Sequence, residues 1–304
     1  KFKIVHLNDV FKKTELDIWS ESPGMPWSQY GYKTKGDIRN DPDAIRSIRK
    51  FWYDIKHGQD VKFPDCRVYV RSNTCDMGEK KVRTVWEYPA TINFGEAVFA
   101  LPLLDAYKEL ADAYRPIAYG FETSTDGIKK LSNRFKGKGS YYVSLQFLKF
   151  DRKIPNFFID RAFLILSYNL NFGDYQEYGV ADARRIDQMF NTLTNYFINT
   201  KIRLPNGERF QKCSGIASGS YFTQLIVSVI TCILVHWAHF KLMNRCPNDV
   251  VCLGGDSLMV TSEKFCLESA NKLFNSIGIE LNIHNSQVEE SLSRVKFLGH
   301  YIKD

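Results

Sequence analysis

The residues best suited to chemistry lie in a short acidic turn between two apolar runs. Residues 250–253 and 258–260 flank Gly254-Gly255-Asp256-Ser257, and glycine supplies the positive φ that a tight β-hairpin turn requires. A carboxylate at the tip of a buried hairpin is normally paired or bound to a metal, because an unpaired buried charge is costly. Asp256 is therefore a candidate catalytic and metal-binding residue, although Gly, Asp and Ser are also ordinary turn residues.

A second acid follows a predicted strand over 141–147. Asp151 comes just before a helix that the pattern predicts from about residue 155 to 171. Ligands often bind at the carboxyl ends of strands in α/β sheets, so Asp151 is a second candidate catalytic residue. The alternative is a helix cap, which is a common position for Asp.

Two further stretches have the composition of nucleotide-binding segments. A small-residue loop from 213 runs directly into a long helix, whose N-terminal N–H groups attract phosphate or ribose. Its candidate binding residues are Ser214, Gly215, Gly219 and Thr223. Upstream, Lys81 precedes a predicted strand over 82–88 and Arg83 lies within it. Both are candidates for holding a triphosphate, although lysine also protects exposed strand edges.

A loop near the N-terminus interleaves aromatic and basic side chains. Residues 20–27 are rich in turn formers and include two prolines, and residues 30–35 read Tyr-Gly-Tyr-Lys-Thr-Lys. Such a loop is able to stack a base and contact phosphate. The alternative is an arm that covers the core with its aromatics turned inward.

Composition restricts the class of protein. The chain has 304 residues, 44% of them hydrophobic and 14% aromatic, which favours an ordered fold. A net charge of +7 permits a polyanionic partner without requiring one. The seven cysteines form no CxxC pair, so neither a zinc ribbon nor a disulfide framework is indicated. The apolar run 225–238 predicts a buried helix rather than a membrane span.

The remaining pattern predicts one continuous α+β unit without repeats. The predicted helices cover 41–58, 93–115 with a break at Pro102, 125–135, 155–171, 182–199, 224–243 and 263–277. The predicted strands cover 67–71, 82–88, 141–147, 280–282 and 295–302, with a hairpin over 201–212.

The order of these stretches resembles the palm of viral RNA-dependent RNA polymerases, most closely those of partitiviruses and related double-stranded RNA viruses. The stretches that carry the resemblance are 150–155, 214–225 and 253–258 for three palm motifs, 297–299 for the closing hairpin, and 22–27 and 81–86 for the fingers. The resemblance implies a right-hand polymerase palm, an antiparallel sheet backed by helices, with fingers and an absent or truncated thumb.

The resemblance also implies a division of the chain. Residues 1–140 are then a fingers-like region with a basic nucleotide-entry strand, and residues 141–304 are mainly palm. The implied palm segments are a first motif over 145–155, a fingers-like insertion over about 172–212, a second motif over 213–231, a hairpin over 250–261 and a closing hairpin over 295–302.

Polymerases of this family transfer a nucleotide with two Mg²⁺ or Mn²⁺ ions held by carboxylates. This sequence departs from the family pattern at those positions. Gln146 stands where the metal-binding Asp of the first motif is expected, and Gly255 replaces the first Asp of Gly-Asp-Asp. Asp151 and Asp256 match the remaining acids. Further departures are at Val227, Thr231 and Asn285. Asp256 alone is a weak metal ligand, so we expect no bound ion.

Three functions stay open from the sequence. The first is a polymerase-derived protein of viral origin, such as a viral gene captured by a host genome, that lacks catalysis and retains RNA or nucleoside triphosphate binding. The second is an active RNA-dependent RNA polymerase. The third is a non-catalytic protein-interaction module on a polymerase scaffold. The cysteine usage and the resemblance favour an intracellular location, cytoplasmic or virion-associated, without a membrane partner.

Overall fold

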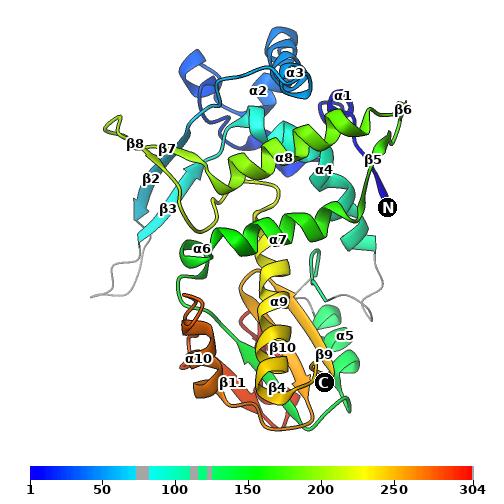
Figure 1. Ribbon diagram of the computed structural model, residues 1–304, viewed down its shortest axis with the longest axis vertical. Helices are drawn as coiled ribbons and strands as arrows, with labels where there is room; N and C mark the ends of the chain where they lie inside the picture. The colour runs from blue at the N-terminus through cyan, green and yellow to red at the C-terminus, as the bar shows by residue number, and fades with distance from the viewer. Residues whose placement is uncertain (73–81, 110–115, 122–124, 303–304) are drawn as a thin grey trace. The chain divides into compact units, whose positions relative to one another are not determined.

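The computed structural model describes residues 1–72, 82–109, 116–121 and 125–302, which form two compact units (Figure 1). Unit 1 contains Lys1–Leu103 and Leu164–Thr223, and unit 2 contains Leu104–Phe163 and Gln224–Asp304. Both units are therefore built from two separate stretches of sequence. The division into fingers-like and palm regions at residue 140 is a different one, and it stays a prediction.

Unit 2 is organised around a four-stranded antiparallel sheet. The strand order is β11 (Gln287–Glu289), β4 (Tyr141–Leu145), β10 (Asp256–Thr261) and β9 (Asp249–Leu253). The hairpin predicted over 250–261 is thus confirmed as β9 and β10. β4 is central in this order, although it comes from the other stretch of unit 2, so the sheet joins residues more than a hundred positions apart.

Helix α9 (Thr223–Met243) runs across one face of this sheet (Figure 1). Among the described residues it is the one helix that is long and apolar enough to cross a membrane. The sequence analysis had limited the apolar run to residues 225–238. Of its apolar window, 61% is buried inside the protein, as in a core helix. His239 illustrates this burial, because its Nε2 lies 3.0 Å from the Thr261 hydroxyl of β10.

A hydrophobic cluster contains side chains from three strands of the sheet, a helix and the closing hairpin. It combines Leu131 and Phe135 of α5 (Thr125–Phe135) with Leu258 and Val260 of β10 and with Phe297. The closing hairpin is confirmed as β12 (Lys296–Phe297) and β13 (His300–Tyr301). The other helices of unit 2 are α6 (Phe150–Lys153), α10 (Leu267–Asn275), the 3-10 turn η4 (Leu292–Arg294) and the first part of α7 (Asn156–Ser167).

Unit 1 contains two sheets and the packed helices α3 (Pro42–Lys56) and α8 (Ala183–Ile198). The sheets have the strand orders β3 (Val82–Glu87), β2 (Cys66–Ser72), β7 (Lys201–Arg203), β8 (Arg209–Gln211) and β1 (Phe2–Ile4), β5 (Leu170–Tyr175), β6 (Gly179–Val180). The short helices are α1 (Leu7–Val10), η1 (Asp17–Ser20), η2 (Trp27–Tyr30) and α2 (Lys35–Arg39). The predicted Asp41 cap of α3 is confirmed, because its Oδ1 accepts from Asp43 N at 2.8 Å.

The predicted break at Pro102 was wrong. Helix α4 (Ala90–Glu109) continues through this proline; residues 110–115 of the longer prediction lie outside the described residues. Proline removes the N–H that would bond the carbonyl of Val98, four residues earlier. Val5 N donates to that carbonyl instead, at 3.0 Å. The amide of Val5, directly after β1, therefore replaces the helical hydrogen bond that Pro102 cannot make.

Three other boundaries differ from the predictions. The predicted helix over 155–171 is α7, which ends earlier, at Ser167, and the short helix α6, which was not predicted, comes before it. The two helices are separated at Pro155, which cannot donate into a helix and restricts the residue before it. The predicted strand at 280–282 is a single bridge between Leu281 and Phe147, and the pairing strand is β11 instead. The predicted helix over 263–277 is shorter, as α10.

Candidate active site

Asp256 is the first residue of β10, directly after the turn that joins it to β9. Gly254 and Gly255 form this turn, and Asp256 pairs in register with Leu253. Gly254 has a φ of +57°, which an L side chain rarely adopts and which glycine reaches without steric cost. The two glycines therefore place Asp256 at the hairpin tip, where its side chain is half-buried.

Two buried hydroxyls of α9 hold this turn. Ser228 Oγ accepts a hydrogen bond from Gly254 N at 2.8 Å, and Thr231 Oγ donates to Gly254 O at 2.7 Å. Both side chains have 0% exposure, so neither has water as an alternative partner. The sequence singled out Thr231 only as a departure from the family, and its contact with the turn could not be foreseen.

Gln146 lies beside Asp256 because of the strand register. Ser257 of β10 pairs with Leu145 of β4 in an antiparallel arrangement. Asp256, just before Ser257, and Gln146, just after Leu145, therefore meet at the same end of the sheet. The Gln146 side chain donates a hydrogen bond to the Asp256 carboxylate. Burial raises the pKa of Asp256 above the usual range of aspartate, and the bond from Gln146 acts in the opposite direction.

The backbone of Gln146 is fixed on both sides. Its N–H donates to Ser286 Oγ at 3.1 Å, and its carbonyl accepts from Asn282 N at 2.7 Å. These bonds come from the stretch just before β11. The position of the Gln146 side chain relative to Asp256 is therefore determined by backbone contacts that do not depend on the side chain itself.

Asp151 lies apart from this pair in its interactions. It is an exposed residue in the first turn of α6, and it makes no hydrogen bond or ion pair with any described residue. The prediction placed it before a helix, whereas it lies inside one. Its neighbour Phe150 instead contacts the turn, because a Cβ added to Gly255 would lie 3.3 Å from Phe150 Cδ1.

The candidate nucleotide-binding loop before α9 belongs to unit 1 and is anchored from three sides. Lys212 Nζ donates to Gly215 O at 2.6 Å, Asn93 Nδ2 to Gly219 O at 2.9 Å, and Thr223 Oγ to Ala217 O at 2.7 Å. Burial lowers the pKa of Lys212 to about 8. Ser214 is exposed and Gly215 is buried, so the loop offers only part of its predicted binding residues to solvent.

The fourth anchor is Glu96, which the sequence analysis did not single out. Its Oε1 accepts from Tyr88 OH at 2.9 Å and from Ser220 Oγ at 2.8 Å, while its Oε2 accepts from Tyr221 N at 3.0 Å and Asn93 Nδ2 at 3.3 Å. Burial raises the pKa of Glu96 to about 7, although these bonds lower it. The available signal was a single charged residue in the largely apolar stretch 90–104.

Of the two upstream basic candidates, Lys81 and Arg83, the structure describes only the backbone of Arg83. Lys81 lies outside the described residues. Arg83 is placed through its backbone, which pairs with Arg71 across β2 and β3, while its side chain lies outside the described part. Their predicted contact with a triphosphate stays a prediction.

Among the described residues, no group of three or more His, Cys, Asp or Glu side chains is arranged to hold a metal ion. The acids that the sequence singled out do not converge in these residues, since Asp256 contacts Gln146 and Asp151 contacts neither. The arrangement offers one carboxylate, one neutral amide and a tightly held backbone turn.

Comparison with known proteins identifies the family. The sequence profile of the family "Viral RNA-dependent RNA polymerase" matches residues 7–304. The RNA-directed RNA polymerase of Cryptosporidium parvum virus 1 (strain KSU-1) is 26% identical over 301 residues, covering 93% of this chain and 53% of the relative. The non-structural polyprotein 1AB of turkey astrovirus 1 is 25% identical over 197 residues, covering 59% of this chain and 12% of the relative.

Two solved structures have the same fold. The RNA-dependent RNA polymerase of a human picorbirnavirus matches with a TM-score of 0.70 at 17% identity, over 98% of this chain and 53% of that one. Its insertion loop deletion mutant matches with a TM-score of 0.71 at 18% identity, over 98% and 55%. The predicted α+β polymerase fold is confirmed. The chain spans about half the length of the polymerases that it matches, and it belongs to the viral RNA-dependent RNA polymerase family.

Proposed function

We propose that this chain is a polymerase-related protein that retains RNA or nucleotide binding and does not catalyse templated nucleotidyl transfer. The observation that supports this most directly is the hydrogen bond from Gln146 to Asp256. At this position a second carboxylate would be needed to hold metal ions, and the side chain present is a neutral amide that donates to the first. We assign residues 141–304 mainly to a palm and residues 1–140 to a fingers-like region.

The donor set around Asp256 does not fit a pair of divalent ions. Mg²⁺ binds carboxylate oxygens and keeps octahedral geometry, and a two-metal site needs several such ligands close together. Gly255 has no side chain, and Gln146 supplies at best a neutral carbonyl. We therefore derive no reaction step through a metal at this hairpin.

Several independent departures in one site favour relaxed selection over tuning of an enzyme. Gln146, Gly255, Val227, Thr231 and Asn285 all differ from the family pattern that the sequence resembles. The Thr231 hydroxyl donates to the Gly254 carbonyl of the turn. These features support the proposal that the sequence is a remnant of a viral polymerase, with Asp151 and Asp256 as the remaining acids.

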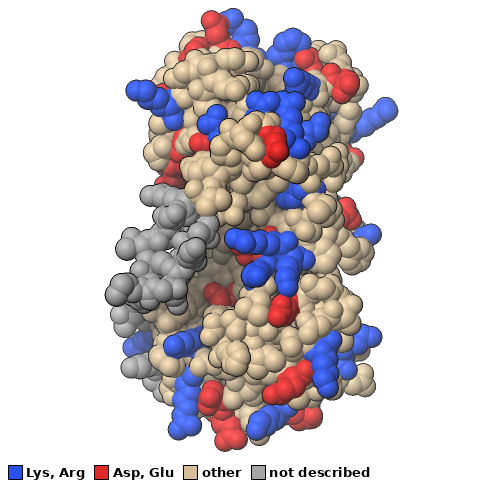
Figure 2. Space-filling view, turned by 90° about the vertical axis from the view of Figure 1, so that its left-hand side faces the viewer, with Lys and Arg blue, Asp and Glu red and all other residues tan. Residues whose placement is uncertain are grey.

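Binding of RNA is supported by charge and by the anchored loop. The chain carries a net charge of +7, and Figure 2 shows Lys and Arg side chains in several groups over one face, with acidic side chains between them. Phosphate contacts depend on such cations. The loop with the candidate residues Ser214, Gly215, Gly219 and Thr223 is held through the carbonyls of Gly215, Ala217 and Gly219 and the amide of Tyr221.

Primer extension tests the catalytic part of the proposal. The chain is incubated with a primed RNA template, nucleoside triphosphates and Mg²⁺ or Mn²⁺, with Asp256→Ala as the matched control. We expect no template-dependent product from either protein. Product that requires template and disappears in Asp256→Ala would establish an active polymerase, which is the second candidate.

A titration with single-stranded RNA at increasing salt tests the binding part. We expect saturable binding whose logarithmic affinity falls linearly with the logarithm of salt concentration, because phosphate contacts release counterions. Binding that is absent even at low salt would favour a protein-interaction module on the same scaffold. The two experiments are independent, so loss of catalysis and loss of RNA binding are judged separately.

A further inference from the structure

A pocket in unit 1, separate from the hairpin and from the loop before α9, combines aromatic walls with basic groups. It has a volume of about 440 Å³ and lies between η2, the start of β2 with the segment before it, α3, and the β7–β8 hairpin. Small-molecule sites typically have volumes of roughly 300–1,000 Å³. All its lining residues are described and belong to the same unit, so the pocket is defined within one compact part of the chain.

Aromatic rings form two sides of this pocket. Trp27 and Tyr30 of η2 meet edge to face with ring centroids 6.1 Å apart, and Phe51 of α3 meets Phe63 in the same way at 5.5 Å. Tyr30 is 69% exposed, so most of its ring surface is open to solvent. Trp27 is fixed because its Nε1 donates to Thr91 Oγ1 at 2.8 Å. The walls therefore offer ring faces and edges on which a planar group can stack.

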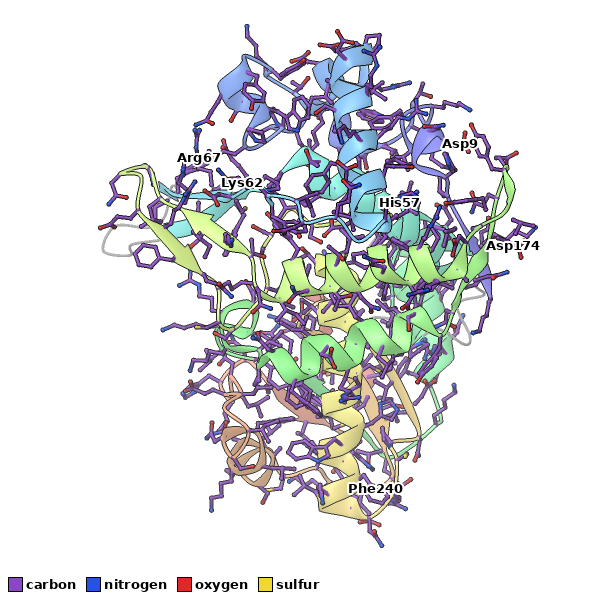
Figure 3. All side chains as sticks on the ribbon, turned by 45° about the horizontal axis from the view of Figure 1, so that its top comes forward. Asp9, His57, Lys62, Arg67, Asp174 and Phe240 are labelled. Carbon is purple, nitrogen blue, oxygen red and sulfur yellow. The ribbon has the colours of Figure 1, made fainter. Side chains whose placement is uncertain are left out.

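The polar part of the pocket is cationic. Lys62, Arg203 and Arg209 line it, together with one acid, Asp65. Lys62 lies on the segment that leads into β2 (Figure 3) and makes no ion pair with a described residue. Three cations against one carboxylate leave an excess of positive charge, so the pocket favours an anionic ligand.

The two arginines are only partly satisfied by Asp65. Arg209 Nε lies 2.8 Å and Arg203 Nε 3.2 Å from the same oxygen, Asp65 Oδ2. Arg203 Nε is buried and has no hydrogen-bond partner, because its approach to Asp65 lacks hydrogen-bonding geometry. Both arginines therefore share one carboxylate oxygen, so one negative charge faces two positive charges on this side of the pocket.

We propose that this pocket binds one nucleotide, with the base against the aromatic walls and the phosphate on Lys62, Arg203 and Arg209. Aromatic side chains beside cations are the combination that recognises single nucleotides and unpaired bases. A simple anion would not use the ring faces, and an apolar ligand would leave the excess positive charge of the pocket uncompensated. The nucleotide is either free or one residue of an RNA strand. This proposal does not rest on the proposed function, because it uses neither the hairpin nor the loop before α9.

The test is calorimetric titration of the whole chain in buffer with EDTA, which removes any contribution from metal-dependent nucleotide binding. The ligands are each of the four nucleoside triphosphates, inorganic triphosphate and a short oligouridylate. We expect saturable binding of at least one nucleotide or of the oligonucleotide, and binding of inorganic triphosphate at least about tenfold weaker, because stacking is worth a measurable share of affinity. Tighter binding of the free nucleotide or of the strand identifies which source the pocket takes.

Three variants locate the binding in the pocket. Tyr30→Ala should weaken it by roughly five- to 150-fold, the range that loss of base stacking produces, whereas Tyr30→Phe keeps the ring and should bind like the native chain. Lys62→Ala should weaken binding by about tenfold, because it removes a charge-assisted phosphate contact. Tyr168→Ala and Lys3→Ala are matched controls, since both are exposed residues outside the pocket.

Two results would overturn the proposal. One is inorganic triphosphate binding as tightly as every nucleotide and as the oligonucleotide, which would mean that no base is recognised. The other is that the pocket is not the site of binding, either because no saturable binding is seen or because Tyr30→Ala and Lys62→Ala leave binding unchanged. Thermal unfolding of each variant shows whether the chain is folded, and Tyr30→Phe keeps the test valid if Tyr30→Ala is unstable.

Discussion

The side chain of Gln146, directly after β4, donates a hydrogen bond to the carboxylate of Asp256 at the start of β10. The register of the two strands brings these residues together, and backbone bonds to Ser286 and Asn282 hold Gln146 in place. The contact decides how the candidate active site is interpreted, because one carboxylate paired with an amide differs chemically from two carboxylates facing each other.

Restoring acids at both departed positions should create a metal site. In the double variant Gln146→Asp, Gly255→Asp, two carboxylates are added beside Asp256, and affinity for Mn²⁺ should rise by more than about tenfold, since ligand charge sets the affinity of such sites. The new Cβ at residue 255 lies 3.3 Å from Phe150 Cδ1, so the ring must shift slightly. Calorimetric titration with Mn²⁺ measures the change.

The matched control adds the same charge elsewhere, as Gln211→Asp, Gly173→Asp in unit 1. It should leave Mn²⁺ affinity unchanged. If the native chain already binds two Mn²⁺ ions as tightly as the double variant, the interpretation of the donor set is wrong. Primer extension by the double variant then shows whether the rest of the scaffold is competent.

Removing the amide should raise the pKa of Asp256 further. In Gln146→Leu the carboxylate loses the hydrogen bond that opposes the effect of burial. A folded-state pKa above the unfolded value contributes stability that is present at low pH and lost as pH rises through the folded-state pKa. The variant should therefore lose more stability than the native chain on going from acidic to neutral pH, by about 1–3 kcal/mol.

Urea unfolding of Gln146→Leu across this pH range measures the difference, with the exposed Gln211→Leu as control. Nuclear magnetic resonance titration of the Asp256 carboxyl carbon reports the pKa directly. An unchanged pKa in Gln146→Leu would show that the amide does not interact with the carboxylate in solution.

Glu96 should make stability depend on pH. Its folded-state pKa is about 7, against an ordinary value of 4.5 for glutamate, so between these pH values the folded chain holds a proton that the unfolded chain releases. The stabilising contribution is complete below the unfolded pKa and is lost as pH rises through about 7. Glu96→Gln removes this dependence, which amounts to on the order of 3 kcal/mol for such a shift.

The amide of Glu96→Gln can replace the protonated acid without losing bonds. Its oxygen can accept from Tyr221 N and Asn93, while its NH₂ group faces the hydroxyls of Tyr88 and Ser220, which are able to accept. Unfolding free energy measured from pH 5 to 8 should be flatter in this variant than in the native chain. The exposed Glu290→Gln should keep the native slope, and an identical slope in all three proteins would contradict the assignment.

The Thr231 hydroxyl should matter more than an equivalent exposed one. Thr231→Val leaves the buried Gly254 carbonyl without this donor and should cost about 1–3 kcal/mol of unfolding free energy. Thr192 also donates to a backbone carbonyl, that of Gln188, at 2.7 Å, but on the surface of α8. Thr192→Val should therefore cost much less in the same urea titration, and equal losses would indicate that burial is not the cause.

Gly219 should tolerate alanine less well than Gly207. Both have a strongly positive φ, +93° and +92°, so alanine at either position incurs a backbone cost of about 1–2 kcal/mol. At Gly219 the added Cβ also lies 3.1 Å from Tyr88 Cβ, whereas at Gly207 nothing lies within 4 Å. Thermal unfolding should show a larger loss for Gly219→Ala, and the excess measures the steric clash alone.

The sequence predicted those elements whose signals are local. The hairpin over 250–261, the capped helix after Asp41 and the closing hairpin near residue 297 each carry their turn or cap residues in adjacent positions. The resemblance to viral polymerases also placed Gln146 and Asp256 in one site. These predictions required only neighbouring residues or the order of motifs along the chain.

The features that the sequence did not predict depend on partners far along the chain. Helix α4 continues through Pro102 because Val5 bonds the carbonyl of Val98, and no local pattern contains that contact. The same holds for Glu96 with Ser220 and for Thr231 with Gly254. In each case a polar group is buried next to a partner that only the folded chain brings close.

The turn at Gly254 is held by the main-chain pairing of β9 with β10 and by the Ser228 and Thr231 hydroxyls of α9. None of these bonds uses a side chain at position 146 or 255. Shape and reactivity are consequently separable at this edge of the sheet. Exchanges at positions 146 and 255 change the donor set around Asp256 without removing the bonds that hold the turn, which makes direct assay of the chain the informative measurement.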